Sequence, residues 1–188
     1  ALLSAVFLKV RLRAEDEPLG LRLHERFFGR YGLFFLVAIG QALIVSLGDL
    51  FYVQIQCLYP WHFVLAAAVT GLCFSLINYA LVFALDNIGM ALSVIVMVMQ
   101  VAGSGGTYPV EVLPDIFQKL YDYMPFKYAM NAMRETIAGM YGSNYTHDIV
   151  VLLCIALGSI IFGLALYYPC LGLNRLIESS KRKSEIMQ

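Results

Sequence analysis

The stretch between Val94 and Leu171 constrains the fold of this chain more than any other. An apolar run enters a break rich in glycine and proline, VAGSGGTYPVEVLP, and two short amphipathic segments separated by Pro125 follow before a final apolar run. Glycine raises the freedom of the backbone, and proline cannot continue a helix. The pattern therefore predicts that the chain stops being a continuous helix near Gly103 and returns to helix only in short pieces.

The composition is typical of a membrane protein. The 188 residues are 60% hydrophobic and only 14% charged, and the mean hydropathy is +0.73. So few charges cannot cover a soluble globule of this size, whereas apolar side chains can face lipid while helices satisfy their own backbone hydrogen bonds. The formal net charge of zero argues against a nucleic-acid partner, because no excess of cations is present to neutralise phosphates. We therefore expect an all-α, polytopic helical membrane protein.

Four apolar runs are candidate membrane spans. A helix needs about 20 residues to cross the hydrocarbon core, so the third run is short unless it begins in the preceding turn or ends below the surface. Residues 1–8 have the character of the end of a preceding transmembrane helix, which indicates a fragment of a longer protein. The four candidate spans are residues 33–55, 61–85, 88–102 and 149–171.

The positions of the cations predict the orientation. Basic residues gather before the first complete span and after the last one, and an even number of crossings puts both groups on one side. Positively charged flanks lie in the cytoplasm, so we expect a multi-pass protein of the cell (plasma) membrane with its N- and C-terminal segments, including the tail 174–188, in the cytoplasm. The cations are Lys9, Arg11, Arg13, Arg22, Arg26 and Arg30 before the first span, and Arg175, Lys181, Arg182 and Lys183 after the last.

The segment 9–31 before the first span is both basic and amphipathic. Leu19, Leu23 and Phe27 repeat at helical spacing, and Arg22 and Arg26 lie on other faces. Such a helix can lie along the inner surface of the membrane. The alternative is a topology anchor with no further role.

The segment 103–148 is predicted to be an external lid or re-entrant hairpin. Its two amphipathic segments are too short and too charged to span, and irregular backbone at membrane depth survives only when it packs in protein or lines a watery cavity. Arg134 and Glu135 are candidates to pair with Asp122 or Asp115 and so hold the lid. The other residues assigned to the break are Gly103, Ser104, Gly105, Gly106, Pro109, Pro114 and Pro125. Phe126, Met130, Met133 and Ile137 are expected to form the apolar face of the second segment.

Four polar residues inside the spans are candidate functional groups, because burying a polar group in the membrane is costly. They are Gln41, Asp49, Asn78 and Gln100. Asp49 is near the predicted outer boundary, where water can reach it. For Gln41 and Asn78, hydrogen bonding between helices is favoured over contact with a substrate. A channel lined by Gln41, Asn78 and Gln100 is a further hypothesis.

No pattern in the sequence indicates an enzyme, a metal or another cofactor. The phosphate-binding loop GxxxxGK[ST] does not occur, so any ATP hydrolysis would come from a separate subunit. The three histidines are predicted to lie on both sides of the membrane, and the cysteines lack the spacing of metal ligands. No serine or cysteine nucleophile has a predicted base beside it.

The order of the short motifs resembles a known family. These motifs are Gln100, SGG at 104–106, Tyr108-Pro109, Leu113-Pro114, Met124-Pro125, Tyr128-Ala129, Arg134-Glu135 before Gly139, and GQALIVSLGDL at 40–50. Together they resemble the C-terminal membrane domain of the YhgE/Pip (phage infection protein) family of ABC-2 type permeases, and the resemblance covers nearly the whole chain.

The resemblance implies a specific architecture and function. It implies an ABC-2 permease-like bundle with short external re-entrant helices before the last span, a coupling helix near residues 19–30 and a large external domain that precedes Ala1. A homo- or hetero-dimer, a separate ATPase subunit and an amphipathic or envelope-related substrate are further expectations. The alternative is the membrane anchor of a phage-receptor or secretion-associated envelope protein that transports nothing itself.

Overall fold

The fold is an all-α membrane bundle in a computed structural model, which describes residues 23–85, 87–103, 112 and 114–185. Regular structure in these residues is helical, which confirms the predicted class. The six helices are α2 (Leu23–Phe51), α3 (Pro60–Leu85), α4 (Asn87–Gly103), α5 (Asp115–Tyr121), α6 (Pro125–Ala138) and α7 (Asn144–Glu185).

Three of these helices are long and apolar enough to cross a membrane. The crossing segments are Phe27–Phe51, Pro60–Leu85 and Asn144–Tyr167. The apolar part of α4, Ile88–Val101, is shorter. These lengths confirm a polytopic helical membrane protein.

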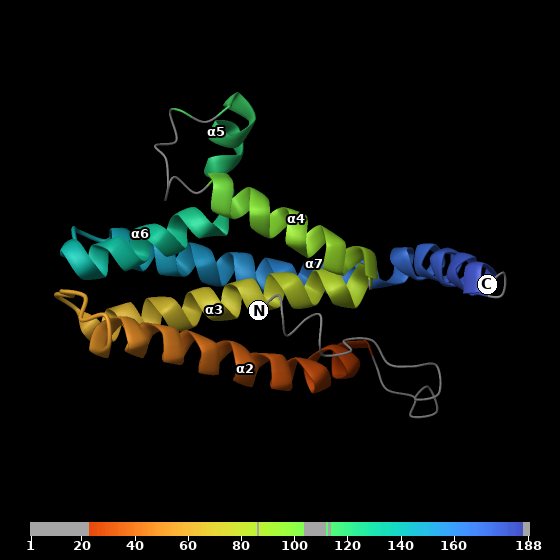
Figure 1. The fold of residues 1–188 in the computed structure, drawn as a ribbon, viewed down its shortest axis with the longest axis horizontal. Coiled ribbons are helices and arrows are strands. Elements are labelled where there is room, and N and C mark those ends of the chain that lie inside the picture. The colour runs from red at the N-terminus through yellow and green to blue at the C-terminus, as the bar shows by residue number, and fades with distance from the viewer. Residues whose placement is uncertain (1–22, 86, 104–111, 113, 186–188) are drawn as a thin grey trace.

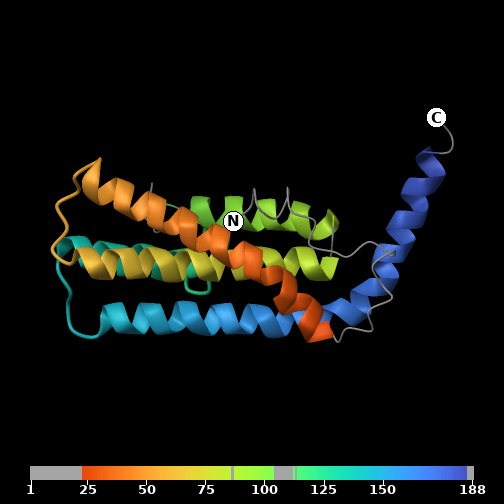
Figure 2. The same cartoon turned by 90° about the horizontal axis from the view of Figure 1, so that it is seen from below.

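The long helices run beside one another, and the bundle has two distinct ends (Figure 1). At the end that we call the terminal end, α2 begins and the C-terminal part of α7 leaves the bundle. At the opposite end, the loop end, residues 52–59 join α2 to α3 and residues 139–143 join α6 to α7. Figure 2 shows α2 crossing the other helices obliquely and α7 bending away beyond the bundle. Pro169 lies inside α7, and an interior proline is a common cause of such a bend.

The most enclosed helix is α3, which packs against α2, α4, α6 and α7. Half of its most apolar window is buried, compared with 17% for the corresponding windows of α2 and α7. A helix that is apolar on all sides suits this central place. The outer helices instead expose large apolar side chains such as Leu36, Ile44, Leu157 and Ile161, as expected for surfaces that face lipid.

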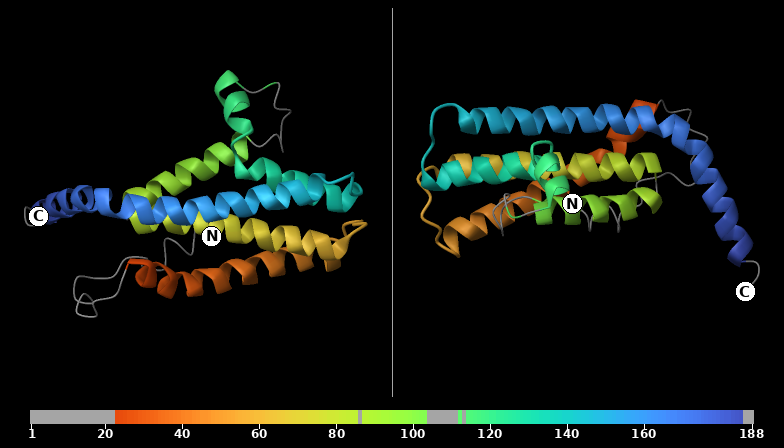
Figure 3. Two further views of the ribbon diagram at one scale, coloured as in Figure 1. Left: turned by 180° about the vertical axis from the view of Figure 1, so that it is seen from behind. Right: turned by 90° about the horizontal axis from the view of Figure 1, so that it is seen from above.

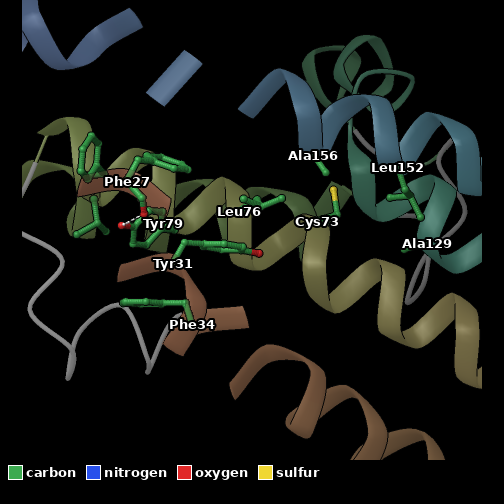
Figure 4. Close-up of a cluster of buried hydrophobic side chains, with 11 residues drawn as sticks. Phe27, Tyr31, Phe34, Cys73, Leu76, Tyr79, Ala129, Leu152 and Ala156 are labelled. Carbon is green, nitrogen blue, oxygen red and sulfur yellow. Dashed lines mark hydrogen bonds between the residues drawn. The ribbon is translucent and has the colours of Figure 1, made fainter. Parts of the chain in front are cut away.

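The main buried core is one cluster of side chains, with an aromatic group in one part of it (Figure 4). Towards the terminal end, aromatic rings of α2 pack on α3, with the Phe27 ring centroid 4.9 Å from that of Tyr79 and 5.1 Å from that of Phe83. Elsewhere Cys73, Ala129, Leu152 and Ala156 bring α3, α6 and α7 together.

The aromatic group explains where the first span begins. We expected a span from residue 33 and a separate segment over 9–31, but α2 is one continuous helix from Leu23. Phe27 is completely buried, and each aromatic pair that it makes is worth about 0.5–1.5 kcal/mol beyond its burial. Packing therefore joins part of the basic segment to the span.

Two glycines bring neighbouring helices close to α3. A Cβ atom added at Gly163 of α7 would lie 2.9 Å from the Cβ of Ala80, and one added at Gly89 of α4 would lie 2.2 Å from the carbonyl oxygen of Leu81. Small residues of this kind permit close packing of helices in a membrane. They fix the positions of α4 and α7 around the central helix.

Candidate functional site

The crossing that begins with α4 is broken. The 17 residues of α4 are ~26 Å long at the helical rise, and the helix ends at Gly103. Phe126, at the start of α6, contacts the ring of Phe74 in the middle part of α3, with the centroids 6.0 Å apart. Near the other end of α6, the carbonyl oxygen of Thr136 accepts a hydrogen bond from the Tyr59 amide at the loop end. Hence α6 occupies the part of the bundle nearer the loop end, while α4 starts at the terminal end.

The short helix α5 stands away from the bundle between these two helices (Figures 1 and 3). Asp122, which follows α5, pairs with Lys127 and not with Arg134 or Glu135 as expected. This hydrogen bond raises the pKa of Lys127 above its ordinary value. The Tyr128 hydroxyl also donates to the carbonyl oxygen of Asp122 over 2.7 Å. These contacts hold the turn between α5 and α6.

The face of α6 that packs most closely consists of small side chains. Pro125, Ala129, Ala132 and Thr136 are buried at helical spacing. The larger side chains of the expected apolar face, Phe126, Met130, Met133 and Ile137, are only half-buried. Small residues occupy the most closely packed positions because they allow the backbones of neighbouring helices to approach one another.

Hydrogen bonds fasten the loop end of α6. The carbonyl oxygen of Thr136 accepts from the Tyr59 amide over 3.1 Å and from the Cys57 thiol over 3.2 Å. The Tyr145 hydroxyl of α7 donates to the carbonyl oxygen of His62 in α3 over 2.9 Å. Thus the connection after α2, the end of α6 and the start of α7 form one linked unit.

A polar pocket of about 300 Å³ lies between α6 and α7. We call it the loop-end pocket. Each helix contributes polar residues at positions i, i+3 and i+4, the spacing that puts side chains on one helix face. The sequence predicts Arg134 and Glu135 as residues of the lid, and it indicates no site for the other lining residues. The lining residues are Asn131, Arg134 and Glu135 from α6, and Asn144, His147 and Asp148 from α7.

The two carboxyl groups of this pocket are partly shielded from water. Asp148 is 7% exposed, and its Oδ1 lies 3.2 Å from His147 Nδ1. Glu135 Oε2 is buried and has no hydrogen-bond partner. The Glu135 and Asp148 carboxyl groups are close enough to interact electrostatically. A shielded carboxylate is costly without a compensating cation.

The candidate intramembrane polar residues differ in their environments. Asn78 of α3 and Gln100 of α4 are buried, whereas Asp49 is half-buried and Gln41 is exposed on α2. Gln100 Oε1 is buried and has no hydrogen-bond partner. Gln100 also lies one turn before the end of α4 at Gly103, which makes it the candidate nearest to the break.

The other candidate residues lie in several places. Gly103 is the last residue of α4, Pro114 precedes α5, and Pro125 is the first residue of α6. Ser104, Gly105, Gly106 and Pro109 fall outside the described residues, as do Leu19 and Arg22. Leu23 and Arg26 lie in the first two turns of α2, and Phe27 packs inside the bundle, so its ring is not available to a partner.

Comparison with known proteins identifies the family. Residues 19–166 match the family described as ABC-2 family transporter protein. The chain is 33% identical over 114 residues to the "Uncharacterized protein YhgE" of Bacillus subtilis (strain 168). That alignment covers 61% of this chain and 15% of the relative, so the chain corresponds to a small part of that protein. No solved structure matches the chain. The similarity confirms the resemblance to YhgE, and the family match extends over most of the helices described above. The chain therefore belongs to the ABC-2 transporter family, as a multi-pass membrane domain.

Proposed function

We propose that this chain is the permease domain through which an ABC-2 type transporter moves an amphipathic or envelope-related substrate, with the energy supplied by a separate ATPase subunit. The observation that supports this function best is the broken crossing, in which α4 and α6 are separate helices with the short helix α5 between them. The family match supports the same role.

The break supplies polar groups at membrane depth. The last carbonyl groups of α4 and the first amides of α6 have no partner within their own helices. Irregular backbone is tolerated there only where it packs in protein or lines a watery cavity. Gln100 adds a buried amide one turn before the break. We assign the substrate path to the region beside Gln100 and Gly103.

The terminal end is proposed to face the cytoplasm and to receive the ATPase. The basic residues of both flanks support this orientation. Because Phe27 is buried, the docking contact is assigned to Arg22 and Arg26 and not to an apolar face that includes Phe27. A dimer of such domains is proposed from the family alone.

The docking proposal can be tested on the intact protein purified from its native membranes in mild detergent. We expect an ATP-hydrolysing subunit to co-purify, and the double variant Arg22→Glu/Arg26→Glu to reduce its retention about tenfold, the effect of ~1.4 kcal/mol. Lys119→Glu is the matched control, because Lys119 is an exposed cation of α5 in the predicted external segment. Equal retention in both variants would contradict the docking site.

Transport itself can be tested after reconstitution of the complex into liposomes. The probe is a phospholipid with a fluorescent headgroup label, and dithionite quenching reports the leaflet in which the label lies. Movement that requires ATP hydrolysis is expected. A protein that performs its role normally in cells without any ATPase would rule out the proposed function.

A membrane anchor without transport activity is the second candidate. It is favoured by one observation, which is that the aligned 114 residues of the chain cover only 15% of the length of YhgE. Expression of residues 1–188 alone separates the two candidates. A permease keeps ATP-dependent movement of the labelled lipid after this truncation, whereas an anchor has no such activity before or after it.

A further inference from the structure

We propose that the loop-end pocket binds an alkylammonium group, such as the primary amine of an ethanolamine headgroup, between the carboxyl groups of Glu135 and Asp148. This inference goes beyond the proposed function, because it requires neither transport nor an ATPase.

The charge of the pocket favours a cation. Two carboxyl groups line it, from the buried Asp148 and the half-buried Glu135, with one permanent cation, Arg134, and Glu135 Oε2 has no donor. His147 is the ion-pair partner of Asp148, and it compensates only when it is protonated. Lys127 also interacts electrostatically with Asp148, but its ammonium group donates a hydrogen bond to the carboxylate of Asp122. A bound ammonium group would supply a second positive charge against the two carboxylates, and charge-assisted hydrogen bonds to carboxylates are the strong ones.

The chemistry of the lining favours a primary amine over other cations. A primary ammonium has three N–H donors, and carboxylate and amide oxygens of this pocket are suitable acceptors. A quaternary ammonium has no donor and is recognised by cages of aromatic rings, whereas His147 is the one ring-bearing residue of the lining. Across the described ranges, no group of three or more His, Cys, Asp or Glu side chains is arranged to hold a metal ion. The pocket therefore suits an organic cation.

The position of the pocket favours a lipid headgroup as the source of the amine. The loop end carries exposed aromatic side chains at Tyr52, Trp61 and Tyr141, and tyrosine and tryptophan are enriched at the level of lipid headgroups. Asn144 and His147 lie in the first turn of α7, immediately after Tyr141. Arg134, which is exposed and lines the same pocket, can bind the phosphate of that headgroup. A volume of about 300 Å³ is at the lower end of the usual range for small-ligand sites.

The test measures lipid retention by the intact protein. The protein is purified in mild detergent, exposed to phosphatidylethanolamine, phosphatidylcholine or phosphatidylglycerol with identical acyl chains, and examined by native mass spectrometry. We expect selective retention of phosphatidylethanolamine. Glu135→Gln should reduce it about tenfold or more, the loss that accompanies removal of one charge-assisted hydrogen bond. Asp148→Asn should have a similar effect.

Asp115→Asn is the matched control, because it neutralises an exposed carboxylate on α5 outside the pocket. Retention should not change in this variant. If Asp148→Asn does not fold, Glu135→Gln decides, since Glu135 is only half-buried. Glu135→Lys provides a second check, because the ammonium group that it introduces should occupy the pocket and abolish retention of the lipid.

A competition experiment separates the two sources of the amine. Soluble phosphoethanolamine that displaces the lipid, with the same sensitivity to Glu135→Gln, supports a site for the headgroup alone. Failure of the soluble compound to compete, with selective lipid retention intact, supports a site that requires the lipid. Equal retention of the three lipids, or selective retention that Glu135→Gln leaves unchanged, would overturn the proposal.

Discussion

The Tyr79 hydroxyl of α3 donates a hydrogen bond of 2.8 Å to the carbonyl oxygen of Phe27 in α2. Both side chains are completely buried, and their rings pack edge to face. The Phe27 ring also contacts Phe83, whose ring stacks on Tyr167 of α7 with the centroids 5.0 Å apart. One aromatic group therefore joins α2, α3 and α7 at the end of the bundle where the proposed ATPase contact lies.

The first prediction concerns this hydrogen bond. Tyr79→Phe should lower the free energy of unfolding by about 0.5–1.5 kcal/mol, because it removes the donor and leaves the packing intact. Tyr79→Ala should cost about 3–5 kcal/mol, because it also leaves a cavity. Unfolding by denaturant titration in micelles, followed by circular dichroism, measures both values. Tyr52→Phe is the control, since Tyr52 is 92% exposed and its replacement should change nothing. Equal losses in the two Tyr79 variants would contradict the packing described.

The second prediction compares two glycines of α7. Gly163→Val should destabilise the protein by about 1–3 kcal/mol through overpacking, because even a Cβ atom would lie 2.9 Å from that of Ala80. Gly158→Val makes the same change in the same helix, where no atom lies within 4 Å of the added Cβ. It should cost less than about 0.5 kcal/mol, as is usual away from packed positions. The melting temperatures of the two purified variants provide the comparison. If both fall equally, close packing at Gly163 does not explain the loss.

The third prediction concerns the turn after α6. Gly139 has φ of 120° and ψ of 136°, a backbone conformation that is strained for residues with a side chain. Gly139→Ala should therefore cost about 1–3 kcal/mol and loosen the contacts at the loop end. Gly142 has φ of 60°, which asparagine tolerates, so Gly142→Asn should be nearly neutral. Hydrogen exchange of the Tyr59 amide, which donates to Thr136, reports the loosening. Protection of this amide that survives Gly139→Ala would count against a strained turn.

The membrane class could be predicted from the sequence because it depends on local composition. The length of an apolar run determines whether a helix can span the membrane, and proline determines where a helix can start. The beginning of α6 at Pro125 and the end of α4 at Gly103 are local features of this kind. The helical structure of residues 23–32, before the predicted span, is not a local feature, because it depends on the contacts of Phe27 with Tyr79 and Phe83, which are far away in the sequence.

The faces of α6 show a second limit of sequence patterns. The large side chains of Phe126 and Met130 dominate a search for an apolar face, but Ala129 and Ala132 are the residues that pack most closely. The loop-end pocket was missed for a related reason. Polar residues recur at i, i+3 and i+4 in both Asn131–Glu135 and Asn144–Asp148, and this shared spacing was the available signal. Only the packing of α6 against α7 shows that the two polar faces meet.

The last prediction separates a structural role of Gln100 from a role in the substrate path. Gln100 is 6% exposed, and its Oε1 has no hydrogen-bond partner. A buried polar group without a partner opposes folding, and an apolar side chain of similar size removes this cost. Gln100→Leu should therefore leave the stability unchanged or raise it by up to about 1 kcal/mol. If the amide contacts the substrate, the same variant should slow ATP-dependent movement of the labelled phospholipid about tenfold, a loss of ~1.4 kcal/mol.

Ser93→Ala is the matched control for this prediction, because Ser93 is also buried on α4 but donates its hydroxyl to the carbonyl oxygen of Gly89 in its own helix over 2.7 Å. Its replacement should leave the movement of the lipid unchanged. Denaturant titration and the dithionite assay are applied to both variants in the same preparation. A Gln100→Leu protein that is less stable than the original and transports normally would show that Gln100 holds the bundle together, and the substrate path would then have to lie elsewhere.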